Sequence, residues 1–122
     1  MIPPDPLPLV DLAARGLLAD TLVLWTTEFT RMPFTQGSVG RDRNGGTSVA
    51  WMDGAGVKGG TTLGASDDFS YQAAENKTSI HDLHATLLHL LVIDHEKLTK
   101  LHNGTNRRLT DVHGKVLSES LG

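Results

Sequence analysis

The chain has 122 residues, a formal net charge of -3 and a sequence pI near 6.0, and 39% of its residues are hydrophobic. This length suits one domain with a single core, and the composition is that of a folded protein rather than a disordered one. The slight acidity argues against a nucleic-acid partner, which usually requires a basic surface. Because cysteine is absent, disulfides and thiolate metal sites are excluded. No apolar run approaches the roughly 20 residues that span a bilayer.

The N-terminal part predicts a helix followed by a buried strand. Residues 1–8 form a proline-rich, extended lead-in that has neither the cationic nor the long apolar region of a signal peptide. Apolar residues then recur at helical spacing over 9–18, where Gly16 weakens the helix end. The strand predicted at 21–26 is apolar on both faces, which favours the interior of a parallel sheet. A helix followed by such a strand indicates an α/β fold.

A polar loop and a glycine-rich turn lie on either side of the second predicted strand. Residues 27–46 are rich in Arg, Gly, Asp and Asn and have little to bury, and 47–52 are then predicted as a strand. Four glycines follow within 53–60, a density that indicates turns with positive φ or close backbone approach. Their spacing is not that of a P-loop. A further short strand is expected near 69–72.

The C-terminal half predicts one helix and one hairpin. Ser79 and Asp82, three residues apart, are typical of a capping-box-like helix start. The apolar residues of this helix fall on one stripe, which we expect to pack on the sheet. The stripe consists of Ile80, Leu83, Leu87, Leu90 and Leu91. Asn103-Gly104, between two short β-like runs, predicts a hairpin turn.

Five of the six histidines lie between residues 81 and 113, which raises the hypothesis of a metal site because neutral imidazole is a common metal ligand. On the predicted helix His81 and His84 are neighbours, whereas His89 lies opposite the apolar stripe. His81 and His84 could therefore share a metal. The alternative is that His84 lies at the edge of the core and His81 is a surface residue. Surface or hairpin positions are expected for His95, His102 and His113.

Two acids of the polar loop are further candidates. Glu28 follows directly after the strand at 21–26, and ligands of open α/β sheets bind at the carboxyl ends of the strands. It is either a metal ligand or the cap of the next turn. Asp42 lies between Arg41 and Arg43 and is either part of a solvated ion pair or a ligand.

Four blocks of the sequence resemble one known family. They are DTLVLWTTEFTRMPFTQGSVGRDRN, WMDGAGVKGGTTLGASDDFSYQAAEN, IHDLHATLLHLLVIDHEKLT and RRLTDVHGKV. In this order they are similar to the C-terminal part of the DUF1501 proteins, sulfatase-like members of the alkaline phosphatase superfamily. The resemblance covers nearly the whole chain from about Leu12 onward.

The resemblance implies a fold and a chemistry. It implies a single partial domain over 1–122, with the lead-in at 1–8 and the C-terminal portion of a DUF1501-like domain at 9–122. Its fold would be an α/β, partial alkaline-phosphatase-like sandwich with a mostly parallel sheet and flanking helices. Enzymes of the superfamily hydrolyse phosphate or sulfate esters with a hydroxyl nucleophile and divalent metals held by Asp and His. Members are often exported by bacteria through a twin-arginine signal, so a periplasmic or exported location is implied.

The resemblance also bears on the candidate site residues. Glu28 matches the acid of the Asp-His pair that follows a core strand in sulfatases, and Glu28 and Asp42 would be the ligands of Zn, Ca or Mn in a longer parent protein. Arg41 or Lys58 could pair with an anionic ester. The segment HDLHATLLHLL resembles a sulfatase helix motif that is chiefly structural, so it does not promote His84 to a ligand. His81 and His84 remain candidates on the helical spacing alone.

Two departures from the family pattern argue against activity. Family members usually have T-E-F-G-R and G-R-D-H-N, whereas this chain has Thr30 in place of the glycine and Arg43 in place of the histidine. Arg cannot ligate a cation, because its guanidinium stays protonated and has no acceptor. The resemblance also implies that the half of the fold with the nucleophile lies outside these 122 residues.

We therefore expect a truncated sulfatase-like domain, related to metal-dependent phosphate or sulfate ester hydrolases, that is inactive alone and lacks the divalent metal. A small anionic ester would be its ligand, and neither nucleic acid nor a membrane is expected as a partner. The alternative is a non-catalytic binding or assembly module. Such a module would pair with a partner, or with a second copy of itself, through an exposed sheet edge.

Overall fold

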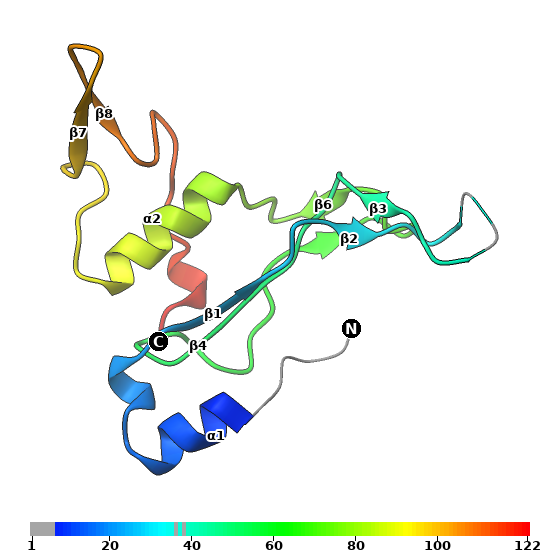
Figure 1. The fold of residues 1–122 in the computed structure, drawn as a ribbon, viewed down its shortest axis with the longest axis horizontal. Helices are drawn as coiled ribbons and strands as arrows, with labels where there is room; N and C mark the ends of the chain where they lie inside the picture. Colours follow the sequence, from blue (N-terminus) through cyan, green and yellow to red (C-terminus); the bar gives the residue numbers. More distant parts are fainter. Residues whose placement is uncertain (1–6, 36, 38) are drawn as a thin grey trace. The chain divides into compact units, whose positions relative to one another are not determined.

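The computed structural model describes residues 7–35, 37 and 39–122, so most of the proline-rich lead-in lies outside the described residues. The chain divides into two compact units (Figure 1). The first comprises residues 1–77 and Gly122, and the second comprises residues 78–121.

Antiparallel strand pairs and short helices make up the first unit. Its helical segments are α1 (Leu7–Ala14) and the 3-10 turn η1 (Leu18–Asp20). Its strands are β1 (Val23–Thr26), β2 (Thr30–Arg31), β3 (Arg43–Asn44), β4 (Ala50–Asp53), β5 (Ala65–Ser66) and β6 (Ala73–Glu75). β1 pairs with β4, β2 with β3, and β5 with β6.

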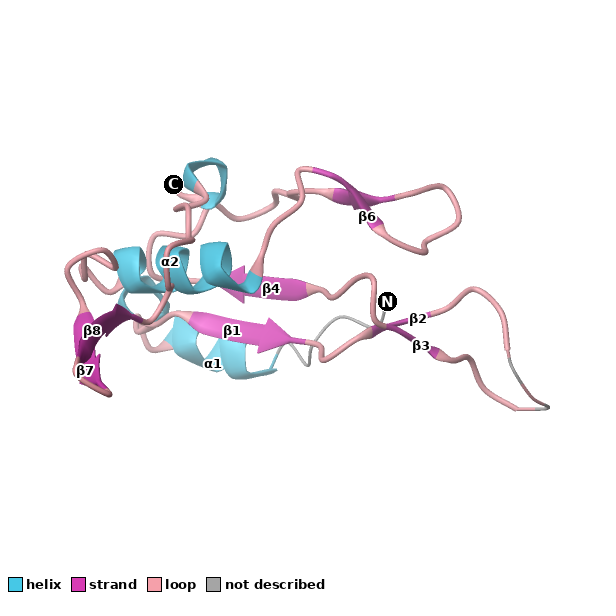
Figure 2. Ribbon diagram, turned by 90° about the horizontal axis from the view of Figure 1, so that it is seen from above, coloured by secondary structure: helices cyan, strands magenta, loops and turns pink. Residues whose placement is uncertain are grey.

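A long antiparallel ribbon forms the spine of this unit. Between the β1–β4 and β2–β3 pairs, the backbone N–H groups of Thr27 and Thr30 donate hydrogen bonds to carbonyls of the opposite arm. The two pairs are therefore parts of one ribbon, which Figures 1 and 2 show running from β1 into β2. In the register of this ribbon, Trp25 of β1 is opposite Trp51 of β4.

The predicted α/β sandwich with a mostly parallel sheet is wrong for this chain. Every strand pair among the described residues is antiparallel and two strands wide. The strands predicted at 21–26 and 47–52 correspond to β1 and β4, but they pair with each other. The physical reason is solvent exposure: the residues of β1 alternate between half-buried and exposed, the pattern of an antiparallel strand with one wet face. Because Val23, Leu24 and Trp25 are all apolar, the sequence does not indicate which side chains are exposed.

Local structure in the first unit follows the sequence in part. α1 begins and ends earlier than the predicted helix, and Gly16, with φ +70°, lies just beyond its end. The strand expected near 69–72 is instead the turn between β5 and β6. The carboxylate of Asp67 stabilises this turn by accepting hydrogen bonds from the backbone N–H groups of Tyr71 (2.7 Å) and Gln72 (3.2 Å).

The glycine-rich segment is a packing turn. Gly54 has φ +84°, and a Cβ there would collide with the backbone carbonyl oxygen of Thr21. The next residue, Ala55, donates its backbone N–H to the carbonyl of Leu18 at 3.1 Å. The predicted positive φ and close backbone approach are therefore confirmed, and the chain itself occupies the space beside Gly54.

The second unit consists of a capped helix, a hairpin and a returning C-terminal segment. Its elements are α2 (Ile80–Leu90), β7 (Thr99–His102), β8 (Thr105–Arg108) and the 3-10 turn η2 (Ser118–Ser120). The capping box is confirmed, because Ser79 Oγ accepts from the N–H of Asp82 and Asp82 Oδ2 accepts from the N–H of Ser79. The hairpin is confirmed as well, with positive φ at Asn103 and Gly104.

The buried side of α2 differs from the predicted apolar stripe. Leu83, Ala85 and Thr86 are buried, whereas Ile80 is 59% exposed and Leu91 is 61% exposed. Thr86 lies inside because its hydroxyl donates to the Asp82 carbonyl (2.8 Å) and accepts from the backbone N–H of Leu117 (2.9 Å). The C-terminal segment thus covers Thr86, a polar residue that the apolar pattern of the helix would predict to be exposed.

Candidate functional site

Glu28, the first candidate, lies between β1 and β2. It follows β1 as predicted, but its carboxylate accepts a hydrogen bond from the guanidinium of Arg43 in β3, at 2.9 Å. Both side chains are exposed, Glu28 by 69% and Arg43 by 62%. Arg43 therefore pairs with the carboxylate that was predicted to be a metal ligand or the cap of the next turn.

The backbone of Asp42, the second acid of the loop, continues the hydrogen bonding between β2 and β3. Its carbonyl accepts the backbone N–H of Met32 at 2.8 Å, which extends the β2–β3 pairing by one residue. Arg41 is exposed, and its carbonyl accepts from the guanidinium of Arg31.

Lys58 and Arg41, the candidates for pairing with an anionic ester, lie toward opposite ends of the ribbon. Lys58 is exposed in the turn that follows β4, and this turn is bonded to η1. Arg41 lies beyond β3. Since β1 and β2 advance about 3.3 Å per residue, roughly 25 Å separate the two ends. The two cations do not converge on one anion.

The helix α2 carries the predicted histidine pair. His84 is exposed. The ring beside His81 belongs to His113, with ring centroids 5.6 Å apart and planes inclined by 40°. Among the described residues, His81 Nδ1 is the buried side-chain nitrogen that has no hydrogen-bond partner.

Hydrogen bonds to Asp82 bring His113 to His81. Oδ1 of Asp82 accepts from the backbone N–H of Lys115 at 2.7 Å, which fixes the returning segment against the start of α2. The hydrogen bond from the backbone N–H of Ser79 is the main reason that the pKa of Asp82 lies below its ordinary value. Gly114, with φ +98°, allows the close approach, because a Cβ there would lie 3.2 Å from the carbonyl oxygen of His81.

A shallow depression of about 480 Å³ opens beside this pair of histidines. Besides His81 and His113 it is lined by Ser79, Asp82, Val112, Gly114 and Lys115. All of these residues come from the first turn of α2 or from the returning segment. The depression is thus formed within the second unit.

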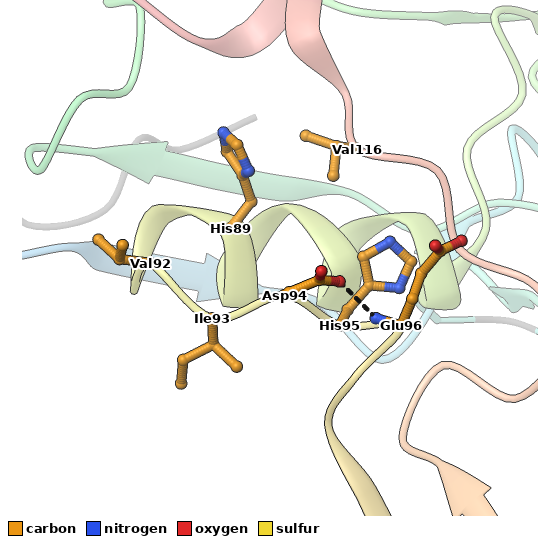
Figure 3. Close-up of a pocket in the computed structure, with 7 residues that line it drawn as sticks. All are labelled: His89, Val92, Ile93, Asp94, His95, Glu96 and Val116. Atoms are coloured by element: carbon orange, nitrogen blue, oxygen red, sulfur yellow. Dashed lines mark hydrogen bonds between the residues drawn. The ribbon is translucent and has the colours of Figure 1, made fainter.

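A second hollow of about 420 Å³ lies around the segment after α2 (Figure 3). His95 Nδ1 is hydrogen-bonded at 3.0 Å to the hydroxyl of Thr110, which is fully buried. The ion pair with Lys97 holds the pKa of Asp94 below its ordinary value, and Asp94 also accepts the backbone N–H of Glu96. In Figure 3, His89 and Ile93 point in opposite directions. The side chains of His95 and Asp94 are thus both held by bonds within the second unit.

The residues predicted from the sequence do not fit a divalent metal as one ligand set. Within residues 7–35, 37 and 39–122, no group of three or more His, Asp or Glu side chains could hold a metal ion. Glu28 is engaged by Arg43, and His84 is exposed. No helix in this part of the chain has the length and apolar character needed to cross a bilayer.

Sequence reasoning missed two partnerships in the second unit. His113 stands beside His81, and Thr110 holds His95. Both depend on where the returning segment docks, which is set by backbone hydrogen bonds to Asp82 and Thr86. The sequence signal for this docking is Asp82 in the capping box. Only one of its carboxylate oxygens is used by the cap, so the other can accept a hydrogen bond from a distant segment.

Comparison with known proteins gives one match. The model of the family described as a protein of unknown function (DUF1501) matches residues 9–121. Searches of the curated proteins and of the solved structures find no match to this chain.

Proposed function

The chain belongs to the DUF1501 family, and we propose that it is a sulfatase-like member of the alkaline phosphatase superfamily that does not hydrolyse esters on its own. Its ancestor would be a metal-dependent phosphate or sulfate ester hydrolase. Divalent metals in such enzymes neutralise the developing charge of the transferring group and activate the nucleophile. In this proposal Glu28 and Asp42 are the remnants of the metal site.

The observation that carries the proposal is the ion pair between Arg43 and Glu28. Arg43 replaces the histidine of the family pattern, so one ligand is lost, and its guanidinium then binds the carboxylate of a second ligand. A guanidinium cannot be deprotonated in a protein and has no lone pair to give. A cation at Glu28 would have to displace a fixed positive charge at 2.9 Å.

The direct test restores the histidine. The wild-type chain, the Arg43→His variant and the Arg41→His variant are compared for divalent metal content and for hydrolysis of aryl phosphate and aryl sulfate esters. Arg41→His is the matched control, because Arg41 is a neighbouring exposed arginine outside the Glu28 ion pair. We expect no turnover by any of the three.

A metal ion that binds Arg43→His in addition to any ion bound by the wild type and by Arg41→His would identify the loop as a decayed metal site. Turnover by the wild-type chain with a stoichiometric metal would overturn the proposal. Arg41 or Lys58 would then be the cation that pairs with the ester anion, and removing the charge of that one residue would raise KM.

The second candidate function is a non-catalytic assembly module that pairs through an exposed sheet edge. Each sheet among the described residues has two strands, so every strand leaves one edge unpaired. The buried hydrophobic residues, Leu83 and Ala85, both belong to the helix α2, whereas Leu24 in β1 and Leu101 in β7 are exposed. Unpaired edges with apolar side chains favour strand addition by another chain.

Sedimentation tests this second function. A self-associating chain would sediment as a dimer or larger species, and Leu24→Lys in β1 would shift it to the monomer because an edge lysine opposes strand pairing. Leu17→Lys is the control, since Leu17 is exposed and lies outside the strands. A monomer at every concentration would count against self-assembly.

A further inference from the structure

The pair formed by His81 and His113 has one property that its surroundings do not account for. His81 Nδ1 is buried without a hydrogen-bond partner, although a buried polar atom usually has one. The centroids of the two rings are 5.6 Å apart, a distance within the ordinary range of ring packing.

That spacing suits two imidazoles on one metal ion. With metal–nitrogen distances of about 2.0 Å and ring centres about 1.2 Å farther out, the centres lie about 5.2 Å apart at a tetrahedral angle and about 6.4 Å apart at a linear one. The observed separation lies between these limits. His113 is exposed, so a cation can reach the pair from the depression beside it.

We propose that His81 and His113 form a two-histidine binding site for a transition-metal dication such as Zn²⁺ in the second unit. The orphaned Nδ1 of His81 is one ligand and the His113 ring is the other. Imidazole suits Zn²⁺, Cu²⁺ and Ni²⁺ rather than the harder Mg²⁺ or Ca²⁺. The site uses neither Glu28 nor Arg43, so it stands independently of the proposed function.

The carboxylate nearest in sequence does not complete the coordination sphere. Asp82 Oδ2 accepts from the N–H and the hydroxyl of Ser79, and Oδ1 accepts from the N–H of Lys115. Asp82 is therefore a positioning residue that holds the His113 segment against α2. Two positions of a tetrahedral sphere remain for water or for an anionic ligand, as in metal sites that bind a further molecule.

The test uses the untagged full chain and two probes. Ni²⁺ and Zn²⁺ are titrated calorimetrically, and Ni²⁺ is titrated by NMR while the histidine ring protons are observed. We expect one site per chain, with the signals of His81 and His113 broadened first. His113→Asn and His81→Asn should each weaken binding at least about tenfold, because the second ligand of a chelating pair acts at high effective concentration.

His84→Asn is the matched control, because His84 lies on the same helix and is exposed. It should bind both cations as the wild type does. If His81→Asn fails to fold, His113→Asn decides the question, since His113 is at the surface. The proposal is overturned if neither cation binds at millimolar concentration, if His113→Asn binds normally, or if the signals of His84 or His89 broaden first.

Discussion

The guanidinium of Arg43 donates a hydrogen bond to the carboxylate of Glu28 at 2.9 Å, and both side chains lie largely in solvent. An exposed ion pair of this kind contributes about 0.2 to 1 kcal/mol to stability. Its magnitude is therefore too small to hold the ribbon together. Its importance in the proposed function is chemical, because it places a permanent cation on the acid that the proposal assigns to a lost metal site.

Arg43→Met should consequently change the free energy of unfolding by less than about 1 kcal/mol, and the change should shrink in high salt. Urea denaturation at low and high ionic strength measures both. A loss several times larger, or one that salt does not reduce, would mean that Arg43 supports the fold in a way that the ion pair does not explain.

Thr86→Val should destabilise the second unit by about 1 to 3 kcal/mol, because it leaves the backbone N–H of Leu117 buried without its acceptor. Hydrogen exchange provides the local measurement: the Leu117 amide should lose protection. The control is Thr61→Val, since Thr61 is exposed and its hydroxyl donates to the carbonyl of Lys58. Equal effects of the two substitutions would contradict the docking of the C-terminal segment on α2.

Gly54→Ala should cost more than about 2 kcal/mol, because Gly54 has positive φ and a Cβ there meets the carbonyl of Thr21. Gly59→Ala is the matched substitution in the same glycine-rich segment. A Cβ at Gly59 finds no heavy atom within 4 Å, and its φ is outside the left-handed region. It should change stability by no more than about 0.5 kcal/mol. Thermal unfolding of both variants measures the two losses of stability. Equal losses would contradict the close packing of the chain at Gly54.

The stability of the second unit should fall at acid pH through Asp82. Its pKa is lowered from an ordinary 3.8, chiefly by the hydrogen bond from the backbone N–H of Ser79. A carboxyl with a lowered pKa in the folded state contributes stability above its unfolded value, and that contribution is lost as pH falls through the folded value.

Asp82→Asn should therefore flatten the dependence of unfolding free energy on pH below 3.8. It should also weaken the helix start by about 1 kcal/mol at neutral pH. Circular dichroism at a series of pH values measures both effects. An unchanged pH profile would show that another carboxyl governs the acid transition.

The sequence predicted the elements whose causes are local. The capping box at Ser79 and Asp82, the hairpin at Asn103-Gly104 and the tight turn at Gly54 depend on a few neighbouring residues, and each is present. The membership in DUF1501 was predicted from four sequence blocks, and the family model covers residues 9–121.

What could not be predicted depends on segments that are distant in sequence. Val23-Leu24-Trp25 is apolar throughout, and only its pairing with β4 decides which side chains meet water. His113 reaches His81 because Lys115 bonds to an acid 33 positions earlier. The buried side of α2 includes Thr86 for the same reason, since its acceptor role toward Leu117 is invisible in a helical wheel.

The measurement that tests the central claim most directly is ester hydrolysis by the wild-type chain and by Glu28→Gln. Both are assayed on phosphate and sulfate esters with added Zn²⁺, Ca²⁺ or Mn²⁺. Because Arg43 already neutralises Glu28, the account predicts that neither protein exceeds the rate of the metal-only blank. Turnover by the wild type that Glu28→Gln abolishes would contradict it.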